Sequence, residues 1–155
     1  VDPGDGRLVF NNTDSVDVKG AEVELQAKWN SGFQARGSYA YAQAADNMTG
    51  AQLNNSPRHL GKLRLTAPVY PNKAFLSLEL LCMSRRTTAQ GGEVPSRALL
   101  NANLFSRELV KNLDISASIY NLLDKRFYDP SSPDFAQELN PRDGRTFRVK
   151  LTYRY

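Results

Sequence analysis

Few residues in this sequence are of the types that perform catalysis or bind metals. Cys82 is the sole cysteine and His59 the sole histidine, so an internal disulfide, a His-based metal site and a histidine dyad are excluded. Cys82 also falls on the apolar face of an expected strand, where a small hydrophobic role is far commoner than a reactive thiol. Asp124, Asp129 and Glu138 lack the alternating acidic spacing of a Ca²⁺ loop, and we expect them to be solvated. The sequence therefore predicts no enzyme, no metal site and no cofactor.

Arg85, Arg86 and Arg97 are the strongest candidates for ligand binding. They fall at the end of one expected strand and the start of the next, where they would form a basic rim beside long loops. Such a rim attracts an anionic ligand, because charge that lines a mouth steers molecules of opposite sign toward it. The alternative, which is the commoner use of such arginines, is contact with lipid headgroups or with Asp and Glu. The other basic residues are spread along the strands, which argues against nucleic-acid binding despite a net charge of +4.

The elements that must position these residues are clearest in the last stretch of the chain. From Phe147 to Tyr155, apolar or aromatic residues occupy the odd positions and polar residues the even ones. This period of two predicts a strand with one apolar and one polar face. Two tyrosines on the apolar face, Tyr153 and Tyr155, favour a barrel in a membrane, where that face meets lipid and aromatic residues lie at the interface.

The same alternation recurs along the whole chain. It predicts six earlier strands, with a short apolar piece as part of an eighth: 20–29, 33–43, 60–68, 74–86, 96–106, 113–121 and the piece 8–10. The strands run about 9 to 12 residues, the length that crosses a bilayer at a tilt. Short and long connections alternate, as in outer-membrane barrels with short turns on one side. We therefore predict one all-β domain, an antiparallel up-and-down transmembrane β-barrel segment of seven to eight strands.

The alternation also predicts which side chains face lipid. We expect these to point outward: Val23, Leu25, Leu63, Leu65, Ile115, Val149 and Leu151. We expect these to point inward: Glu24, Arg36, Arg64, Asp114, Arg148 and Lys150. Opposite charges on three neighbouring strands should form a ladder across the polar wall, each cross-strand pair contributing a few tenths of a kcal/mol. Its members would be Glu22, Glu24, Lys28, Arg36, Lys62 and Arg64.

One segment after the penultimate strand resembles a known signature. Asn121-Leu-Leu-Asp-Lys-Arg-Phe-Tyr128 is similar to the motif that follows the penultimate strand of TonB-dependent receptors, and its matching positions are Asn121, Leu122, Asp124 and Tyr128. Further stretches resemble the family in its own order, namely 19–24, 56–59, 141–147 and the terminal Tyr155, so the resemblance covers about residues 19–155. Tyr155 stands where Phe is commoner, and Lys150 where many outer-membrane proteins have Gly.

The resemblance implies a fold, a location and partners. It implies that residues 1–155 are the C-terminal barrel segment of a receptor in the bacterial outer membrane, used for uptake of a ferric siderophore or similar nutrient. Its partners would be outer-membrane lipid, the remaining barrel strands, an N-terminal plug that is absent here and, indirectly, TonB. Phe147, Tyr153 and Tyr155 would belong to a barrel-assembly signal. The start of the chain, with neither Met nor a signal peptide, indicates a processed or cut chain.

Two other functions stay open at this point. The chain could be a self-contained eight-stranded outer-membrane barrel, an adhesin or a small-ligand binder, if the terminal strand pairs with residues 8–10. A less favoured alternative is a soluble ligand-binding barrel, which would turn its apolar face inward.

Overall fold

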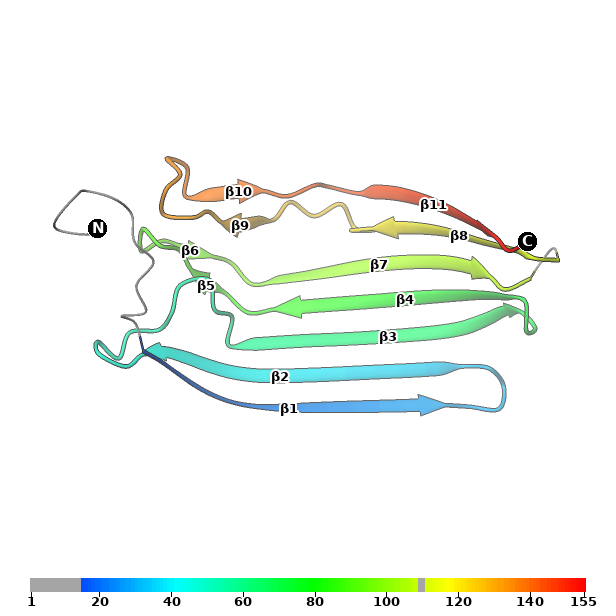
Figure 1. Ribbon diagram of the computed structural model, residues 1–155, viewed down its shortest axis with the longest axis horizontal. Coiled ribbons are helices and arrows are strands. Elements are labelled where there is room, and N and C mark those ends of the chain that lie inside the picture. The colour runs from blue at the N-terminus through cyan, green and yellow to red at the C-terminus, as the bar shows by residue number, and fades with distance from the viewer. Residues whose placement is uncertain (1–14, 109–110) are drawn as a thin grey trace.

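Seven long strands form a single antiparallel sheet in the computed structural model, which describes residues 15–108 and 111–155 (Figure 1). In spatial order they are β1 (Val16–Lys28), β2 (Gln34–Asp46), β3 (His59–Tyr70), β4 (Ala74–Met83), β7 (Arg97–Ser106), β8 (Leu113–Tyr120) and β11 (Thr146–Tyr153). Each long strand pairs with the next long strand of the sequence, so the sheet is an up-and-down meander. The predicted fold class and all seven full strands are confirmed. No helix of the described residues is long and apolar enough to cross a membrane.

Two short ribbons lie within connections that we expected to be loops. β5 (Arg86–Thr87) pairs with β6 (Glu93–Val94), and β9 (Tyr128–Pro130) pairs with β10 (Leu139–Pro141). The expected strand 74–86 accordingly ends early, because the ladder with β3 stops at Met83 and the chain then enters the β5–β6 ribbon. Ladders of two or three residues are too short to show an alternation of apolar and polar side chains.

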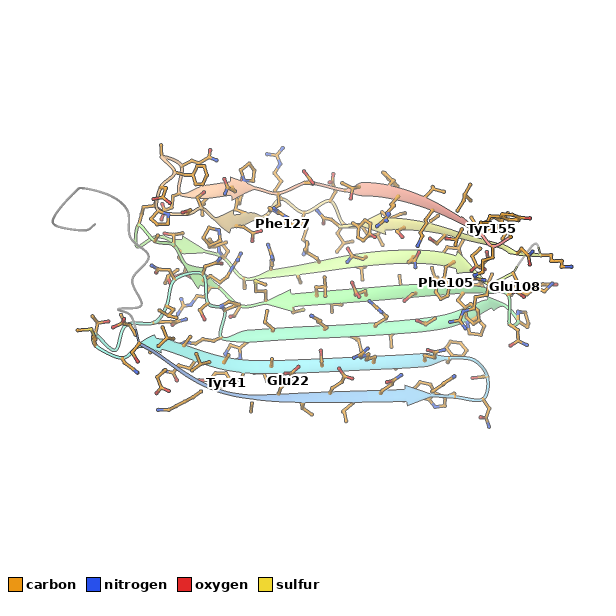
Figure 2. The ribbon with its side chains drawn as sticks, in the orientation of Figure 1. Glu22, Tyr41, Phe105, Glu108, Phe127 and Tyr155 are labelled. Carbon is orange, nitrogen blue, oxygen red and sulfur yellow. The ribbon has the colours of Figure 1, made fainter. Side chains whose placement is uncertain are left out.

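The connections separate by length, as predicted. The short turns, 29–33, 71–73 and 107–112, lie with the C-terminus at one end of the sheet, called here the short-turn end (Figure 1). The long connections, 47–58, 84–96 and 121–145, lie with both ribbons at the opposite end, called here the long-loop end. Figure 2 shows Tyr155 at the short-turn end and Phe127 toward the long-loop end. Between neighbouring strands the ladders satisfy the backbone polar groups, as lipid requires, whereas the outer sides of β1 and β11 have no partner strand among the described residues.

The two faces of the sheet differ as the alternation predicts. Directly paired residues share a face, and Leu65 lies opposite Ala35 and Leu78, while Val149 lies opposite Ala117. This face is uncovered: Leu25 is 72% exposed and Val149 71% exposed. A soluble barrel would bury such a face in its interior, so this alternative is not supported. The predicted outward and inward sets fall on opposite faces of the sheet.

The polar face carries a row of charges across the first four strands. Arg36 donates to Glu24 at 2.8 Å, and Arg64 is bound to Glu79. Arg36 and Arg64 are direct cross-strand partners, so the predicted ladder of opposite charges is only partly correct. Like charges side by side are unfavourable. Here Arg36 is paired with Glu24 on β1, and Arg64 is paired with Glu79 on β4. Glu79 of β4, which was not among the predicted members of the ladder, neutralises Arg64 and also accepts a hydrogen bond from the Asn101 side chain at 3.3 Å.

The sheet is open at both edges within the described residues. β1 pairs only with β2, and β11 pairs only with β8. The described strands therefore do not close a barrel among themselves, as the self-contained alternative requires. The expected strand piece 8–10, the proposed partner of β11 in that alternative, lies outside the described residues.

Candidate functional site

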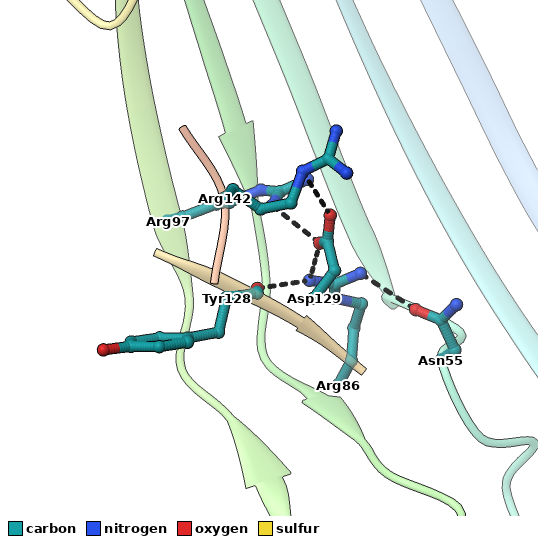
Figure 3. Close-up of polar contacts among 6 residues, drawn as sticks. All are labelled: Asn55, Arg86, Arg97, Tyr128, Asp129 and Arg142. Carbon is teal, nitrogen blue, oxygen red and sulfur yellow. Dashed lines mark hydrogen bonds and ion pairs between the residues drawn. The ribbon is translucent and has the colours of Figure 1, made fainter. Parts of the chain in front are cut away.

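The candidate site lies at the long-loop end, where three connections that are far apart in the sequence meet around one carboxylate (Figure 3). Asp129 Oδ1 accepts from Arg86 at 2.7 Å and from Arg97 at 2.8 Å. Asp129 Oδ2 lies 3.3 Å from Nε of Arg142. With Asn55, these residues are called the Asp129 cluster. They belong to β9, β5, the start of β7, the segment after β10 and the loop after β2.

Arg86 is the buried centre of the Asp129 cluster. Only 6% of it is exposed, and its Nη1 donates to Asn55 Oδ1 at 2.8 Å. Its Nη2 donates to the Tyr128 carbonyl at 3.3 Å as well as to Asp129. Asn55 adopts a positive φ of 55°, which asparagine tolerates, and its N–H donates to the Thr87 carbonyl at 2.9 Å. One arginine therefore ties the loop after β2 to both ribbons.

Positive charges outnumber negative charges in the Asp129 cluster. Three guanidinium groups face one carboxylate, an excess of two positive charges. Burial alone would raise the pKa of Asp129, but the hydrogen bonds and charges of Arg86 and Arg97 hold that pKa below its usual range. Asp129 is therefore ionised at neutral pH, and the surroundings stay positive.

A second contact joins the two later connections. The Thr88 hydroxyl, 1% exposed, donates to Glu138, and the Gly92 N–H donates to the same carboxylate oxygen at 3.0 Å. A Cβ at Gly92 would overlap the Glu138 carboxylate, which would have to move away and give up this contact. The Ser131 N–H donates to the Glu138 carbonyl at 2.9 Å. The Asp129 cluster and this contact together hold the long connections as one unit, called here the loop block.

The predicted binding arginines all lie at the long-loop end but do not form one group. Arg86 and Arg97 converge on Asp129, and Arg97 also lies 5.0 Å from the centre of the Phe127 ring. Arg85 points elsewhere: its side chain is 75% exposed and its Nη1 lies 3.4 Å from Glu93. Pairing with acids, the commoner use of rim arginines, is thus present for each of them.

The expectation that the loop acids are solvated is wrong for Asp129 and Glu138. Asp129 and Glu138 are the acceptors that hold the loop block together. Asp124 is exposed, yet its Oδ1 accepts from the Arg145 N–H at 2.8 Å and so fixes the approach to β11. The partners lie 13 to 50 positions away in the sequence, so no local pattern reveals them. Asn55 and Arg142 were missed for the same reason.

The motif Asn121–Tyr128 has a structural role. Asn121 is 4% exposed and has a φ of 51°; its side chain donates to the Lys125 carbonyl at 2.9 Å and accepts from the Lys125 N–H at 3.1 Å. The Leu122 N–H donates to the Leu100 carbonyl at 2.7 Å, which anchors the turn on β7. The motif thus fixes how the chain leaves β8, and its Tyr128 carbonyl accepts from Arg86.

The Asp129 cluster at this end is rich in guanidinium groups. The described residues contain no group of three or more His, Cys, Asp or Glu side chains placed to hold a metal ion. Guanidinium groups instead provide several donors in a planar arrangement that matches carboxylate and phosphate oxygens.

Comparison with known proteins agrees with this architecture. The family model "TonB dependent receptor-like, beta-barrel" matches residues 1–122. The siderophore receptor PiuA from Acinetobacter baumannii superposes with a TM-score of 0.74 at 20% identity, covering 93% of this chain and 22% of that one. BauA, the ferric preacinetobactin receptor from Acinetobacter baumannii, gives 0.75 at 18% identity, with 90% and 22% covered. The copper transporter OprC gives 0.75 at 17% identity, with 89% and 23% covered.

These comparisons show family and fold. A comparison with curated protein sequences gives no match. The chain spans about a fifth of the length of the solved structures it matches, and at these identities the likeness concerns the fold alone. The family model, in contrast, covers most of the chain. The chain therefore belongs to the β-barrel family of TonB-dependent receptors, and it forms part of a receptor barrel in the outer membrane rather than an enzyme.

Proposed function

We propose that residues 1–155 form the C-terminal part of the barrel of a TonB-dependent transporter that takes up a ferric siderophore or a similar anionic chelate. The remaining strands and an N-terminal plug would complete the receptor, and TonB would supply energy through that plug. The observation that carries this proposal is the junction of an open membrane-type sheet with a positively charged loop block. The names of PiuA and BauA, a siderophore receptor and a ferric preacinetobactin receptor, are in keeping with it.

Arg85, Arg86 and Arg97 are proposed as the ligand-binding residues of this segment, with different tasks. Arg86 and Arg97 stay fixed on Asp129 and contribute a standing positive field. Arg85 is exposed and only loosely paired with Glu93, so it is free to contact a ligand directly. A positive mouth raises the local concentration of an anionic ligand and speeds its capture.

Copper is the second candidate, because the copper transporter OprC superposes equally well. The excess of guanidinium groups in the Asp129 cluster disfavours it, since a free metal cation would be repelled there. An anionic ferric chelate would be attracted by the same charges.

Uptake by cells that carry the full-length receptor as their sole receptor of this kind tests the proposal. We expect accumulation of radioactive iron from ferric siderophores and no receptor-dependent accumulation of copper. Arg85→Gln should lower the initial uptake rate about threefold to tenfold, as expected for one charge-assisted contact that is partly exposed. Arg126→Gln, which changes another exposed loop arginine, is the matched control and should leave the rate unchanged. Receptor-dependent copper uptake without iron uptake would contradict the proposal.

A further inference from the structure

We propose that a cavity in the loop block binds one oxyanion group, a carboxylate or a phosphate, of an anionic ligand. The cavity lies between the loop after β2 and the β5–β6 ribbon, and Arg58, Arg85, Arg86 and Glu93 are among the residues that line it. The inference rests on the proposed function for the source of that group, which would be one arm of the transported chelate.

The size of the cavity fits a single functional group. Its volume is about 320 Å³. A water molecule takes roughly 30 Å³ of liquid, so the cavity has room for about ten waters. A carboxylate or phosphate group of a ferric chelate, with its hydration, fits in this volume. The rest of such a ligand would remain outside, toward the mouth.

Arg86 supplies a fixed positive wall. Asn55 and Asp129 hold its two terminal nitrogens, so the guanidinium cannot turn away. Its buried Nε has no hydrogen-bond partner among the residues that the structure describes. Because this Nε is closed off from solvent, Arg86 acts on an anion in the cavity through its charge, and the direct hydrogen bonds come from other residues of the lining.

Arg85 and Arg58 supply the adjustable side of the cavity. Both are exposed, and Arg85 lies 3.4 Å from each oxygen of Glu93, longer than a good charge-assisted hydrogen bond. Glu93 therefore acts as a weak internal competitor for Arg85. When an oxyanion enters, Arg85 can leave Glu93 for the stronger acceptor.

The charges of the residues that line the cavity decide whether an anion or a cation binds there. Three guanidinium groups, those of Arg58, Arg85 and Arg86, stand against the one carboxylate of Glu93. Asp129 compensates Arg86 from the other side but is shared with Arg97 and Arg142, which do not line the cavity. The lining thus has positive charge left over for an anion.

Tungstate is the probe for this inference, because it is a compact oxyanion that is visible by anomalous scattering. Crystals of the full-length receptor soaked in sodium tungstate should show an anomalous peak in the cavity beside Arg85 and Arg86. In calorimetric titrations at constant ionic strength, Arg85→Gln should weaken tungstate binding about tenfold, the value of one charge-assisted hydrogen bond. Glu93→Gln should strengthen binding about twofold to fivefold, because an exposed competing ion pair is removed.

The control and the contrary outcomes separate this inference from the proposed function. Arg126→Gln removes an exposed loop arginine that lies outside both the cavity lining and the Asp129 cluster, and it should change tungstate affinity by less than about twofold. No peak in the cavity, or weaker binding in Glu93→Gln, would overturn the inference while iron uptake by the unchanged receptor still decides the proposed function. Tungstate binding in a receptor that takes up no iron chelate would refute the proposed function and leave the oxyanion site in place.

Discussion

The sheet and the loop block of this protein are held together by different kinds of interaction. The sheet is a continuous backbone ladder over seven strands, with an apolar face that the chain itself leaves uncovered. The loop block depends on a few side chains, with two carboxylates that collect donors from several connections. A lipid environment stabilises the first, whereas the second needs ionised groups in fixed places. Changes to the lipid face should therefore act on the whole receptor, and changes to the Asp129 cluster should act locally.

The largest effect is expected from a charge on the lipid face. Leu65 lies near the middle of β3, and Leu65→Arg should lower the free energy of unfolding of the full-length receptor by about 2 to 4 kcal/mol, the cost of arginine at the bilayer midplane. Urea unfolding of the receptor in phospholipid bilayers measures this change in the free energy of unfolding. Thr66→Arg places the same charge on the next residue, which faces the polar side, and should cost less than about 1 kcal/mol. Equal costs for the two variants would mean that the faces are assigned wrongly.

An intermediate and local effect is expected from the Asp129 cluster. Asp129→Asn leaves buried Arg86 without its counter-charge, and it should lower the free energy of local opening of the loop block by about 1 to 3 kcal/mol. Hydrogen exchange of residues 84–96 and 128–141 measures the change. Asp134→Asn alters an exposed acid of the same connection, bound only to Ser132, and should leave the exchange as it was.

The same residue predicts a pH dependence. Because the pKa of Asp129 is held below its ordinary value, its contribution is fully present above the unfolded pKa of about 4 and is lost as the pH falls through the lower, folded value. The protection of the loop block against exchange, corrected for the intrinsic exchange rate at each pH, should therefore fall below about pH 4, and this extra acid sensitivity should be missing in Asp129→Asn. An identical acid profile in the two proteins would show that Asp129 is not responsible.

The smallest effect on stability is expected at the end of the chain. Tyr155 is fully exposed beyond β11, at the short-turn end, so its deletion should change the free energy of unfolding by less than about 0.5 kcal/mol. We nevertheless expect a several-fold fall in outer-membrane yield, because the terminal aromatic residue would act during insertion together with Phe147 and Tyr153. Yield from quantitative immunoblots of membrane fractions, compared with Tyr155→Phe, measures this. Unchanged yield after deletion would exclude the assembly role.

The contrast between the sheet and the loop block also explains which parts of the structure could be predicted from the sequence. The alternation runs through most of the long strands and is weaker in β4, where Phe75, Leu81 and Met83 put apolar groups on the polar face. The strands, their faces and the separation of short from long connections therefore follow from periodicity. The Asp129 cluster has no period. Its contacts join residues 13 to 43 positions apart, and the electrostatic role of Asp129 exists only after the connections have been placed in space. The same holds for Glu79, whose importance depends on Arg36 and Arg64 becoming neighbours.

The open edges have a consequence for handling this segment by itself. All thirteen residues of β1 are exposed, and the outer sides of β1 and β11 retain backbone groups that no described strand occupies. Such edges are templates for further strands. Separated from the other strands of a receptor, each copy could pair its two edge strands with the edge strands of further copies, so that copies would associate edge to edge into chains. The yield of soluble, single copies should then fall with concentration, so work on this segment is best done within the intact receptor.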